Sequence, residues 1–533
     1  MLEIVYLKNG NELTTNTSCE DFIISASGNN RNIITIKTKC PIILKSARIN
    51  NIWKISDDNQ FFLNGYQSWS ATRISSLKNK EKNLNKVPRK LRDKYCLDTY
   101  GDSSFYHYDK NKMHGYDLFY LEGKNELFSF NHNYKTSYLI YEINKKDKML
   151  SLESAINGLK IEENEECTIF DYSLYESITE GKKAFYECFP LMNKEKLFGY
   201  CSWYNYYNNI NEDIINRDID SLDDRFNLVQ IDDGFQEFVG DWMNIDKRKF
   251  PNGLKQIVDN IHAKGKKAGI WVAPFAAESE SDIFKTHPEY FLRRNGEFVK
   301  VGTNWSGFYT FDLENRDALL YIKECLQYLM DLGFDFFKLD FLYIASLNQY
   351  DGKTRAMVAR NCYEFLRDVL KDKLILGCGA SLFSSIGLFD YMRIGTDVVL
   401  SLNEMLIVRL LGLHKVSTKM TLKNTIYRSM FNHHLFLNDP DVFILRNKTK
   451  TLNKKNKVAI AKINSLFSGI LLTSDDVGTY DEFGQALLNE VYDIFCNAKE
   501  QKFSVFKNRV NVSYKLNNKK HSFIYDVKKG VIK

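Results

Sequence analysis

The chain lacks the features that mark secreted and membrane-spanning proteins. No apolar run in its 533 residues approaches the roughly 20 residues needed to cross a bilayer. Residues 1–8 show no basic patch followed by a long apolar core, so we expect no secretory signal. The ten cysteines are scattered from Cys19 to Cys496 without a Cys-x-x-Cys pair. This distribution is typical of reduced thiols and predicts a cytoplasmic protein.

Several classes of binding site also lack their signals. No Gly-x-Gly-x-x-Gly or Walker-type loop follows an apolar run, which argues against a nucleotide-binding sheet. The net charge is only +6, from 73 basic and 67 acidic residues, and favours neither nucleic acid nor an anionic membrane as a partner. His433 and His434 are adjacent and therefore point in opposite directions on a helix or strand, so a structural role is favoured over metal ligation. We therefore expect neither a metal nor a cofactor.

Aromatic residues, in contrast, are abundant at 14% of the chain. Tyrosine and tryptophan rings stack well on flat apolar groups while keeping a polar atom for hydrogen bonding. The faces of a pyranose ring are such groups. The composition therefore suits a sugar-binding surface.

The order of the predicted elements divides the chain into three parts. Residues 1–190 carry short β-branched and aromatic runs between turn clusters, which predicts a large β-sandwich. Residues 191–495 alternate apolar strands with helical patterns, which predicts parallel βα units, closed as a (β/α)8 barrel or open as a doubly wound sheet. Residues 496–533 return to strand-like runs and predict a small C-terminal β domain. Asn252 and Asn315 are predicted to cap helices that begin at the next residue.

Two predicted strands of the second part end in carboxylates. In the run 334–340, Lys338 and Asp340 share one face because side chains alternate across a strand, and the lysine is expected to keep Asp340 ionised. A second strand ends in Asp232 and Asp233. Barrel enzymes keep their chemistry at the carboxyl ends of parallel strands. For either strand alone, turn-forming aspartates that cap a buried strand are an equally good explanation.

If the barrel closes, further polar and aromatic side chains reach the same mouth. They are Trp203, Tyr204, Trp271, Cys378, Arg393 and Asp397. Glycoside hydrolysis needs one carboxylate as nucleophile, a second as proton donor, and others to hold hydroxyl groups. A metal site is the competing use of several aspartates, but the mouth offers no histidine at ligand spacing and Lys338 would repel a cation.

Six ordered motifs run through the predicted barrel. They are Phe198-Gly-Tyr-Cys-Ser-Trp-Tyr204, Gln230-Ile-Asp-Asp-Gly-Phe-Gln236 with Gly240-Asp-Trp242, Ala268-Gly-Ile-Trp-Val-Ala-Pro-Phe275, Lys338-Leu-Asp-Phe341, Gly377-Cys-Gly-Ala380 and Met392-Arg-Ile-Gly-Thr-Asp397. In order and spacing the chain resembles glycoside hydrolase family 36, the melibiase-type α-galactosidases, and the resemblance extends through Asn438-Asp-Pro-Asp441. The resemblance implies an N-terminal β-supersandwich, a central (β/α)8 TIM barrel and a C-terminal β-sandwich, which is short here.

The resemblance also implies roles for individual residues. Asp340 matches the nucleophile and Asp397 the acid/base, whose pKa neighbouring carboxylates are expected to raise. Asp232 and Asp233 match the pair that binds O4 and O6 of the sugar. The other pocket positions are matched by Lys338, Cys378 and Arg393, by the aromatic residues Trp203, Tyr204 and Trp271, and by Trp69, which the N-terminal domain lends to the mouth. The implied reaction releases terminal α-linked galactose with retention, through a covalent galactosyl-enzyme.

Some alternatives stay open at this point. An α-N-acetylgalactosaminidase or a transglycosylase fits the same scaffold, although Cys378, expected near O2, mildly favours plain galactose. A sugar-binding protein without activity would require Asp340 or Asp397 to be replaced, and both are present. Trp69 has a core role as its alternative. Thr396 stands where the family commonly has proline, so the loop before Asp397 is expected to be less rigid. The expected partner is an α-galactoside oligosaccharide or glycan, with self-association implied by the resemblance alone.

Overall fold

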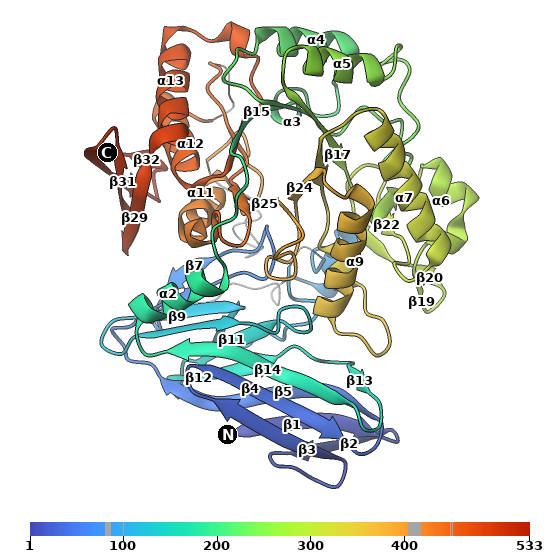
Figure 1. The fold of residues 1–533 in the computed structure, drawn as a ribbon, viewed down its shortest axis with the longest axis vertical. Coiled ribbons are helices and arrows are strands. Elements are labelled where there is room, and N and C mark those ends of the chain that lie inside the picture. Colours follow the sequence, from blue (N-terminus) through green and yellow to red (C-terminus); the bar gives the residue numbers. More distant parts are fainter. Residues whose placement is uncertain (80–86, 100, 403–416, 448, 450) are drawn as a thin grey trace.

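The computed structural model describes residues 1–79, 87–99, 101–402, 417–447, 449 and 451–533. In Figure 1 the N-terminal sheets, blue to cyan, lie below a central barrel of strands and helices. The C-terminal strands, dark red, lie against one side of that barrel (Figure 1). The predicted succession of an N-terminal β part, a barrel and a small C-terminal β part is confirmed.

Two antiparallel sheets form the N-terminal part. The first has the order β2-β1-β5-β12-β11-β8, with β13 beside β5. Its strands are β1 (Leu2–Lys8), β2 (Asn11–Thr15), β5 (Ile42–Lys54), β8 (Lys112–Tyr116), β11 (Leu139–Asn144), β12 (Met149–Ser154) and β13 (Lys160–Ile161). The second has the order β3-β4-β14-β10-β9-β6-β7. Its strands are β3 (Phe22–Gly28), β4 (Arg31–Thr38), β6 (Gln60–Leu63), β7 (Arg73–Ser75), β9 (Leu118–Glu122), β10 (Leu127–Asn131) and β14 (Glu166–Tyr175).

Strands β6, β9 and β10 of the second sheet are buried on both faces. On β6, Phe61 packs into the core between the two sheets, whereas Phe62 joins the core shared with the barrel and with α2 (Ile178–Cys188). On β9, Phe119 and Tyr120 divide in the same way. Double burial accounts for the nearly continuous apolar runs of these strands. It also fastens the sandwich to the barrel.

The central sheet closes into a parallel barrel. Within the described residues its order is β26-β25-β24-β23-β17-β16-β15-β28-β27, and neighbouring strands run parallel. The strands are β15 (Leu197–Cys201), β16 (Leu228–Ile231), β17 (Lys267–Val272), β23 (Phe336–Leu339), β24 (Leu374–Gly377), β25 (Tyr391–Arg393), β26 (Leu437–Asp439), β27 (Val442–Phe443) and β28 (Ile470–Thr473). The two ends of this order, β26 and β27, are halves of one strand interrupted by Pro440 and Asp441. Proline has no N–H for the strand ladder, so the interruption falls there. Because β26 pairs with β25 and β27 with β28, the ring is complete and the open sheet is excluded.

Helices cover the outside of the barrel strands (Figure 1). They include α3 (Trp203–Tyr206), α4 (Glu212–Ser221), α5 (Lys255–Ala263), α7 (Arg316–Asp331), α8 (Ile344–Leu347), α9 (Arg355–Leu370), α11 (Thr418–Tyr427), α12 (Lys454–Phe467) and α13 (Glu482–Asn497). A short helix, α1 (Arg89–Lys94), lies in the N-terminal part. Asn315 caps α7 as predicted, since its side chain accepts from the N–H groups of Asp317 and Ala318. The prediction for Asn252 is wrong: α5 begins after Leu254, which provides no side-chain cap.

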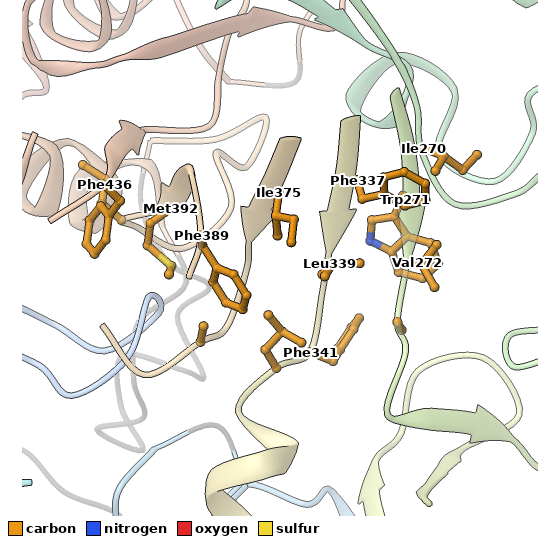
Figure 2. Close-up of a cluster of buried hydrophobic side chains, with 14 of the residues drawn as sticks. Ile270, Trp271, Val272, Phe337, Leu339, Phe341, Ile375, Phe389, Met392 and Phe436 are labelled. Atoms are coloured by element: carbon orange, nitrogen blue, oxygen red, sulfur yellow. The ribbon is translucent and has the colours of Figure 1, made fainter. Parts of the chain in front are cut away.

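Alternation along β23 separates the protein core from the barrel interior. Phe337 and Leu339 point to the helices and pack with Ile375 of the next strand (Figure 2). Phe336 belongs to the smaller cluster inside the barrel, and Lys338 follows it on that face because the side-chain period of a strand is two. The predicted shared face of the lysine and the carboxylate follows from the same rule.

A long excursion separates β17 from β23. It contains a three-stranded sheet with the order β18-β22-β21 and a small hairpin. These elements are β18 (Ala276–Glu278), β19 (Arg293–Arg294), β20 (Glu297–Phe298), β21 (Lys300–Gly302) and β22 (Phe308–Thr310), with the short helices α6 (Asp282–Thr286) and η2 (Pro288–Tyr290). The turn between β21 and β22 carries Trp305.

The C-terminal strands form one layer where a sandwich was expected. The sheet has the order β29-β30-β31-β32, with β29 (Lys499–Phe506), β30 (Arg509–Leu516), β31 (Lys519–Asp526) and β32 (Val531–Ile532). So short a segment supplies strands for a single sheet only, and the barrel takes the place of a second layer. Tyr427 of α11 lies against Phe503, and the Asn456 side chain of α12 donates to the carbonyl of Gly530 at 2.8 Å.

Candidate active site

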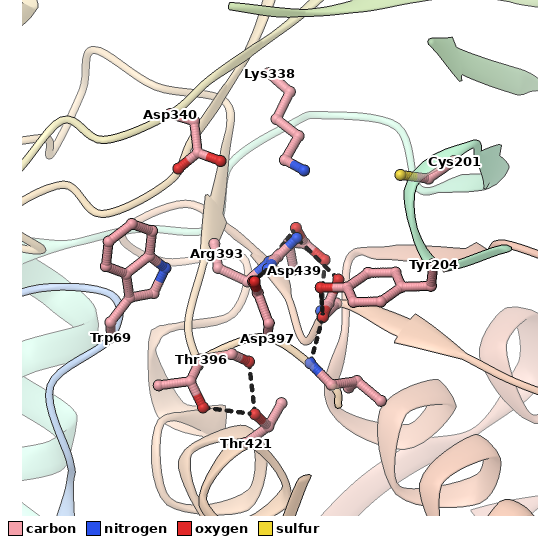
Figure 3. Close-up of polar contacts among 12 residues, drawn as sticks. Trp69, Cys201, Tyr204, Lys338, Asp340, Arg393, Thr396, Asp397, Thr421 and Asp439 are labelled. Atoms are coloured by element: carbon pink, nitrogen blue, oxygen red, sulfur yellow. Dashed lines mark hydrogen bonds and ion pairs between the residues drawn. The ribbon is translucent and has the colours of Figure 1, made fainter. Parts of the chain in front are cut away.

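The residues predicted for the site lie at the carboxyl ends of the barrel strands. Asp232 and Asp233 follow β16, Trp271 lies on β17, Lys338 and Asp340 end β23, Cys378 follows β24, Arg393 ends β25 with Asp397 in the loop beyond, and Trp203 and Tyr204 lie on α3 after β15. Parallel strands of a barrel deliver their carboxyl ends to one rim. The side chain of Trp69 reaches the same region from the N-terminal part (Figure 3).

Two N–H groups hold the carboxylate of Asp340. Nε1 of Trp271 donates to Oδ2 at 2.9 Å, and the backbone N–H of Phe341 donates to Oδ1 at 2.7 Å. Asp340 is 9% exposed. Phe341 has a φ of 56°, in the left-handed region that bulky residues rarely adopt, so the chain bends sharply just after the carboxylate. The donors fix the orientation of the carboxylate toward the mouth.

Lys338 pairs with Asp232, a partner that the shared strand face of Lys338 and Asp340 did not predict. Its Nζ lies 2.7 Å from Oδ2 of Asp232, and the two side chains are 5% and 3% exposed. Strand β17 separates β16 from β23, so the lysine reaches across the barrel interior to this partner. Burial by itself would raise the pKa of Asp232, but the charge and hydrogen bond of Lys338 hold this pKa below its ordinary value.

Asp233, the next residue, has a different environment. Its Oδ1 accepts from Nε2 of Gln236 at 2.6 Å, and its Oδ2 accepts from Nε1 of Trp305 at 2.9 Å. Burial raises the pKa of Asp233 to about 6, although both hydrogen bonds act to lower it. Asp233 therefore takes up a proton more readily than Asp232 does, because only Asp232 has a lysine partner.

Arg393 faces three carboxylates. Its Nε donates to Oδ2 of Asp439 at 2.9 Å, its Nη1 donates to Oδ1 of Asp397 at 3.0 Å, and its Nη2 lies 2.9 Å from Oδ1 of Asp441. Asp439 and Asp441 have fully buried side chains, whereas the side chain of Asp397 is 48% exposed. One guanidinium does not balance three carboxylates, so the cluster favours the retention of a proton. Asp397 is the member that opens toward the mouth.

Burial and like charge raise the pKa of Asp397. The side chain opens to the mouth, but the barrel residues that surround it displace much of the water around the carboxyl group, and this desolvation is the largest cause. The charge of Asp340 adds to it, while Arg393, Lys338 and the hydroxyl of Tyr204 act in the opposite direction. The direction agrees with the sequence prediction, but burial contributes more than the like charge on which that prediction depended. A raised pKa suits a group that must hold a proton for a leaving group.

Asp441 joins the loop after Asp397 to the interrupted barrel strand. Its Oδ2 accepts from the hydroxyl of Tyr204 and from the N–H of Val398, the latter at 2.6 Å (Figure 3). Burial raises the pKa of Asp441 to about 7, against the charge of Arg393. Asp441 thus holds both the neighbouring backbone and the tyrosine next to the exposed carboxylate.

Thr396 has a specific contact that restrains the loop. The Oγ1 atoms of Thr396 and Thr421 lie 3.0 Å apart, and Oγ1 of Thr421 donates to the carbonyl of Thr396 at 2.5 Å (Figure 3). Thr421 lies on α11, which packs beside the barrel. The expected loss of rigidity at this non-proline position is therefore compensated by two hydrogen bonds to a helix.

Trp69 lies at the end of the barrel and also packs against aromatic residues of the core. It is partly buried, and its ring lies 5.6 Å from the rings of both Phe341 and Tyr343. Gly379 has a φ of 72°, and a Cβ added there would lie 3.5 Å from Cη2 of Trp69. The glycine that follows Cys378 thus lies next to the tryptophan, and its left-handed φ is what favours glycine at this position.

Cys378 and Trp203 complete the set. Cys378 is 1% exposed, and burial followed by the charge of Asp340 raises the pKa of its thiol, so the group is neutral. The ring of Trp203 is partly exposed and packs edge-on against Tyr207 at 5.2 Å.

The sequence motifs did not identify Trp305 as a site residue and assigned no role to Asp439 and Asp441. The two aspartates lie in a quoted motif, and a proline between two carboxylates at a strand end was the available signal. For Trp305 the signal was a tryptophan inside the turn-like run Thr303-Asn-Trp-Ser-Gly307.

No group of three or more His, Cys, Asp or Glu side chains in the described ranges is arranged to hold a metal ion. His434 uses its Nδ1 to contact the carbonyl of Phe189 at 2.6 Å, which agrees with the structural role predicted for it. Among the described helices, none has the length and apolar character required to cross a membrane.

Comparison with known proteins gives a family for the barrel. Residues 202–364 match the model of the Melibiase protein family, which confirms the resemblance found from the motifs. The chain is 28% identical over 151 residues to an α-galactosidase of Escherichia coli, a stretch that covers 27% of this chain and 21% of that relative. It is 32% identical over 103 residues to the α-galactosidase Mel36A of Lactobacillus acidophilus, covering 18% of this chain and 14% of the relative. These matches span less than a quarter of each relative.

The fold as a whole is similar to that of a solved α-galactosidase. The structure of TtGalA from Thermus thermophilus, in complex with p-nitrophenyl α-D-galactopyranoside, superposes with a TM-score of 0.71 at 21% sequence identity. The match covers 93% of this chain and 98% of TtGalA. The three-part architecture is therefore shared over almost the whole length of both chains.

Proposed function

We propose that this chain, whose residues 202–364 match the Melibiase family, hydrolyses terminal α-linked galactosides with retention of configuration. The observation that carries the proposal is the contrast between Asp340 and Asp397. Asp340 is held by two N–H donors, while Asp397 opens to the mouth with a raised pKa. A retaining glycosidase needs one ionised carboxylate and one protonated carboxyl group.

In the first step, an oxygen of Asp340 attacks the anomeric carbon of the galactoside. The bond from that carbon to the leaving oxygen breaks, and Asp397 gives its proton to this oxygen. Trp271 and the N–H of Phe341 orient the attacking carboxylate. The product of this step is a β-galactosyl ester of Asp340.

In the second step, Asp397 has become a carboxylate and takes a proton from water. The resulting hydroxide attacks the anomeric carbon, the ester bond breaks and Asp340 leaves as a carboxylate. Two inversions give net retention. Arg393 lies 3.0 Å from Asp397 and compensates the negative charge that this residue carries between the steps.

The charged residues at the end of β16 are suited to the sugar hydroxyl groups. Asp232, paired with Lys338, and Asp233, held by Gln236, keep free acceptor positions on buried carboxylates. We assign them to O4 and O6. The axial O4 of galactose can bind this buried charged pair. The equatorial O4 of glucose would leave the pair without a hydrogen-bond partner, so the site should discriminate against glucose.

The test compares p-nitrophenyl α-D-galactopyranoside with its α-D-glucopyranoside and 2-acetamido counterparts. We expect hydrolysis of the galactoside, little hydrolysis of the glucoside, and α-galactose as the first sugar product by proton NMR. Preferred cleavage of the 2-acetamido substrate would make the protein an α-N-acetylgalactosaminidase instead. Transfer to an added sugar acceptor in place of water would favour the transglycosylase, and binding without turnover would favour a sugar-binding protein.

Three further properties belong to the same proposal. We propose an α-galactoside oligosaccharide or glycan end as the natural substrate, in line with the α-galactoside bound in TtGalA. The ten cysteines are free, which supports a cytoplasmic location. Self-association is a proposal from the family resemblance, and light scattering after size-exclusion chromatography tests it.

A further inference from the structure

Trp305 contacts the candidate active site from outside the barrel strands. It lies in the turn between β21 and β22, and its Nε1 donates to Oδ2 of Asp233 at 2.9 Å. Its ring lies 5.4 Å from that of Phe341 and 6.1 Å from that of Trp271. Trp305 thus connects the residue that follows Asp340 with the outer of the two β16 carboxylates.

The backbone of Trp305 is in an uncommon conformation. Its φ is 51°, and Phe341, which it contacts, has a φ of 56°. Left-handed φ angles at bulky aromatic residues carry strain and persist where the surroundings over-determine them. Two such residues in contact beside a carboxylate site point to a functional constraint on Trp305.

Glu278 supplies the surroundings that hold this turn. Glu278 is 7% exposed and lies at the end of β18. Its Oε2 accepts from the N–H and the hydroxyl of Ser306, at 3.2 and 2.8 Å, and its Oε1 accepts from the N–H of Val239 at 2.8 Å. A buried carboxylate with three donors fixes the residue next to Trp305.

No neighbouring cation pairs with the side chain of Asp233 among the contacts of the described residues, so hydrogen bonds hold its position. Asp232 precedes it, Glu278 adds negative charge from β18, and Lys338 is engaged with Asp232. Lys249 directs its Nζ to the carbonyl of Gly234 at 3.0 Å. The Asp233 carboxylate accepts hydrogen bonds from the neutral side chains of Gln236 and Trp305.

We infer that Trp305 is a specificity-determining residue that positions Asp233 to accept the C6 hydroxyl of the galactosyl group. The inference rests on the proposed galactosidase function. Asp232 forms an ion pair with Lys338 inside the barrel, and this pair suits O4. Asp233 and the indole of Trp305 lie on the outer side. There the apolar CH₂ of a hydroxymethyl group can contact the indole ring, and its hydroxyl can donate to Asp233.

The test compares two substrates that differ only at C6. These are p-nitrophenyl α-D-galactopyranoside and p-nitrophenyl α-D-fucopyranoside, which is the 6-deoxy sugar and keeps the axial O4. In Trp305→Phe we expect the ratio of kcat/KM for galactoside over fucoside to fall about ten-fold, the size typical of losing one hydrogen bond to a charged group. Trp53→Phe, in β5 of the N-terminal part, is the matched control and should leave the ratio unchanged.

A pH profile separates positioning from a general disturbance. The indole N–H acts to lower the pKa of Asp233, so its loss should raise that pKa above the present value of about 6. The acidic limb of kcat/KM for the galactoside should then move to higher pH in Trp305→Phe, while the limb for the fucoside stays in place. Movement of both limbs together would assign the effect to Asp340 or Asp397 and overturn the inference.

A second variant acts at a distance from the sugar. Glu278→Gln removes acceptor capacity from the turn, keeps both side-chain donors of Asp233, and should lower the galactoside-to-fucoside ratio. Because it also removes a charge that raises the pKa of Asp233, the acidic limb should not move to higher pH in this variant. An unchanged ratio in both Trp305→Phe and Glu278→Gln, in protein that keeps its melting temperature, overturns the inference. Failure of the wild-type protein to cleave either substrate would overturn the proposed function itself. That outcome differs from an unchanged ratio in active variants, which would overturn only the role of Trp305.

Discussion

Arg428 of the barrel donates from Nη1 to the carbonyl of Ser68 in the N-terminal part, at 2.7 Å. The same nitrogen donates to the carbonyl of Ile394, one residue after β25, also at 2.7 Å. Nη2 donates to the carbonyls of Gln67 and Ser70, and Nε donates to the hydroxyl of Thr72. All five N–H groups of a fully buried guanidinium are thus used, and every acceptor is neutral. The loop that carries Trp69 is fixed to the strand that carries Arg393 through this side chain.

Arg428→Lys is predicted to loosen that junction. Lysine has three N–H donors, so at least two buried acceptors lose their partner, at a cost of about 2–4 kcal/mol. The melting temperature by scanning calorimetry should fall, and kcat/KM for the galactoside should fall with it because the Trp69 loop is held less well. Arg89→Lys is a control, since that side chain is 86% exposed. An unchanged melting temperature in Arg428→Lys would show that the junction depends on other contacts.

Trp69→Ala tests whether the N-terminal part contributes to the site. If Trp69 forms the cover of the mouth, kcat/KM should fall by the equivalent of about 1–3 kcal/mol with little change in melting temperature. A core residue would instead cost about 3–5 kcal/mol of stability and leave kcat/KM of the folded enzyme unchanged. Its partial burial and its contacts with Phe341 and Tyr343 favour the first outcome.

Asp340→Gly should abolish turnover, by about 10⁴-fold or more, because the nucleophile is lost. Azide should restore part of the rate by attacking in a single inversion, and NMR should identify the product as β-galactosyl azide. The fold should be retained, since the substitution leaves core packing intact. Near wild-type activity in this variant would remove Asp340 from the nucleophile role.

Asp397→Ala should differ in both substrate dependence and product. A nitrophenol leaves without protonation, so the first step should proceed and the galactosyl-enzyme should accumulate on Asp340, visible by mass spectrometry. Azide should then give α-galactosyl azide, the opposite anomer to that from Asp340→Gly. A disaccharide substrate should be cleaved far more slowly. Equal losses of the first step on both substrates would contradict the acid role.

The sequence was a good guide wherever a local rule decided the structure. The shared face of Lys338 and Asp340 follows from the period of a strand, and the cap at Asn315 follows from side-chain chemistry at a helix start. The motifs gave the order of the strand ends and therefore the set of residues at the barrel mouth.

Contacts across the barrel could not be predicted in this way. The partner of Lys338 is Asp232, which lies two strands away in the sheet. The spacing of residues within one strand cannot predict a contact between two strands. Trp305 reaches Asp233 from an excursion whose placement depends on the buried Glu278. Asn252 has the residue type of a cap, yet its side chain donates to Glu212, because a competing partner lies nearby in the folded chain.

Asp441 and Tyr204 should control the basic limb of the pH profile in opposite directions. The limb reports the ionisation of Asp397, which must be protonated in the first step. Asp441→Asn removes a negative charge from the Arg393 cluster and leaves Arg393 less neutralised. Both effects lower the pKa of Asp397, so the basic limb of kcat/KM should move to lower pH. Asparagine tolerates the φ of 75° at this position, so the variant should keep its backbone.

Tyr204→Phe should move the same limb to higher pH. The tyrosine hydroxyl donates to Asp441 and acts to lower the pKa of Asp397, so its removal raises that pKa and keeps the acid protonated over a wider range. A disaccharide with a poor leaving group is the substrate of choice, because its cleavage requires the proton. Thr421→Val is the matched control, as it loosens the loop at Thr396 without changing any charge near Asp397. A shift of the limb in the same direction for Asp441→Asn and Tyr204→Phe would show that the two side chains only shape the loop and do not set the proton on Asp397.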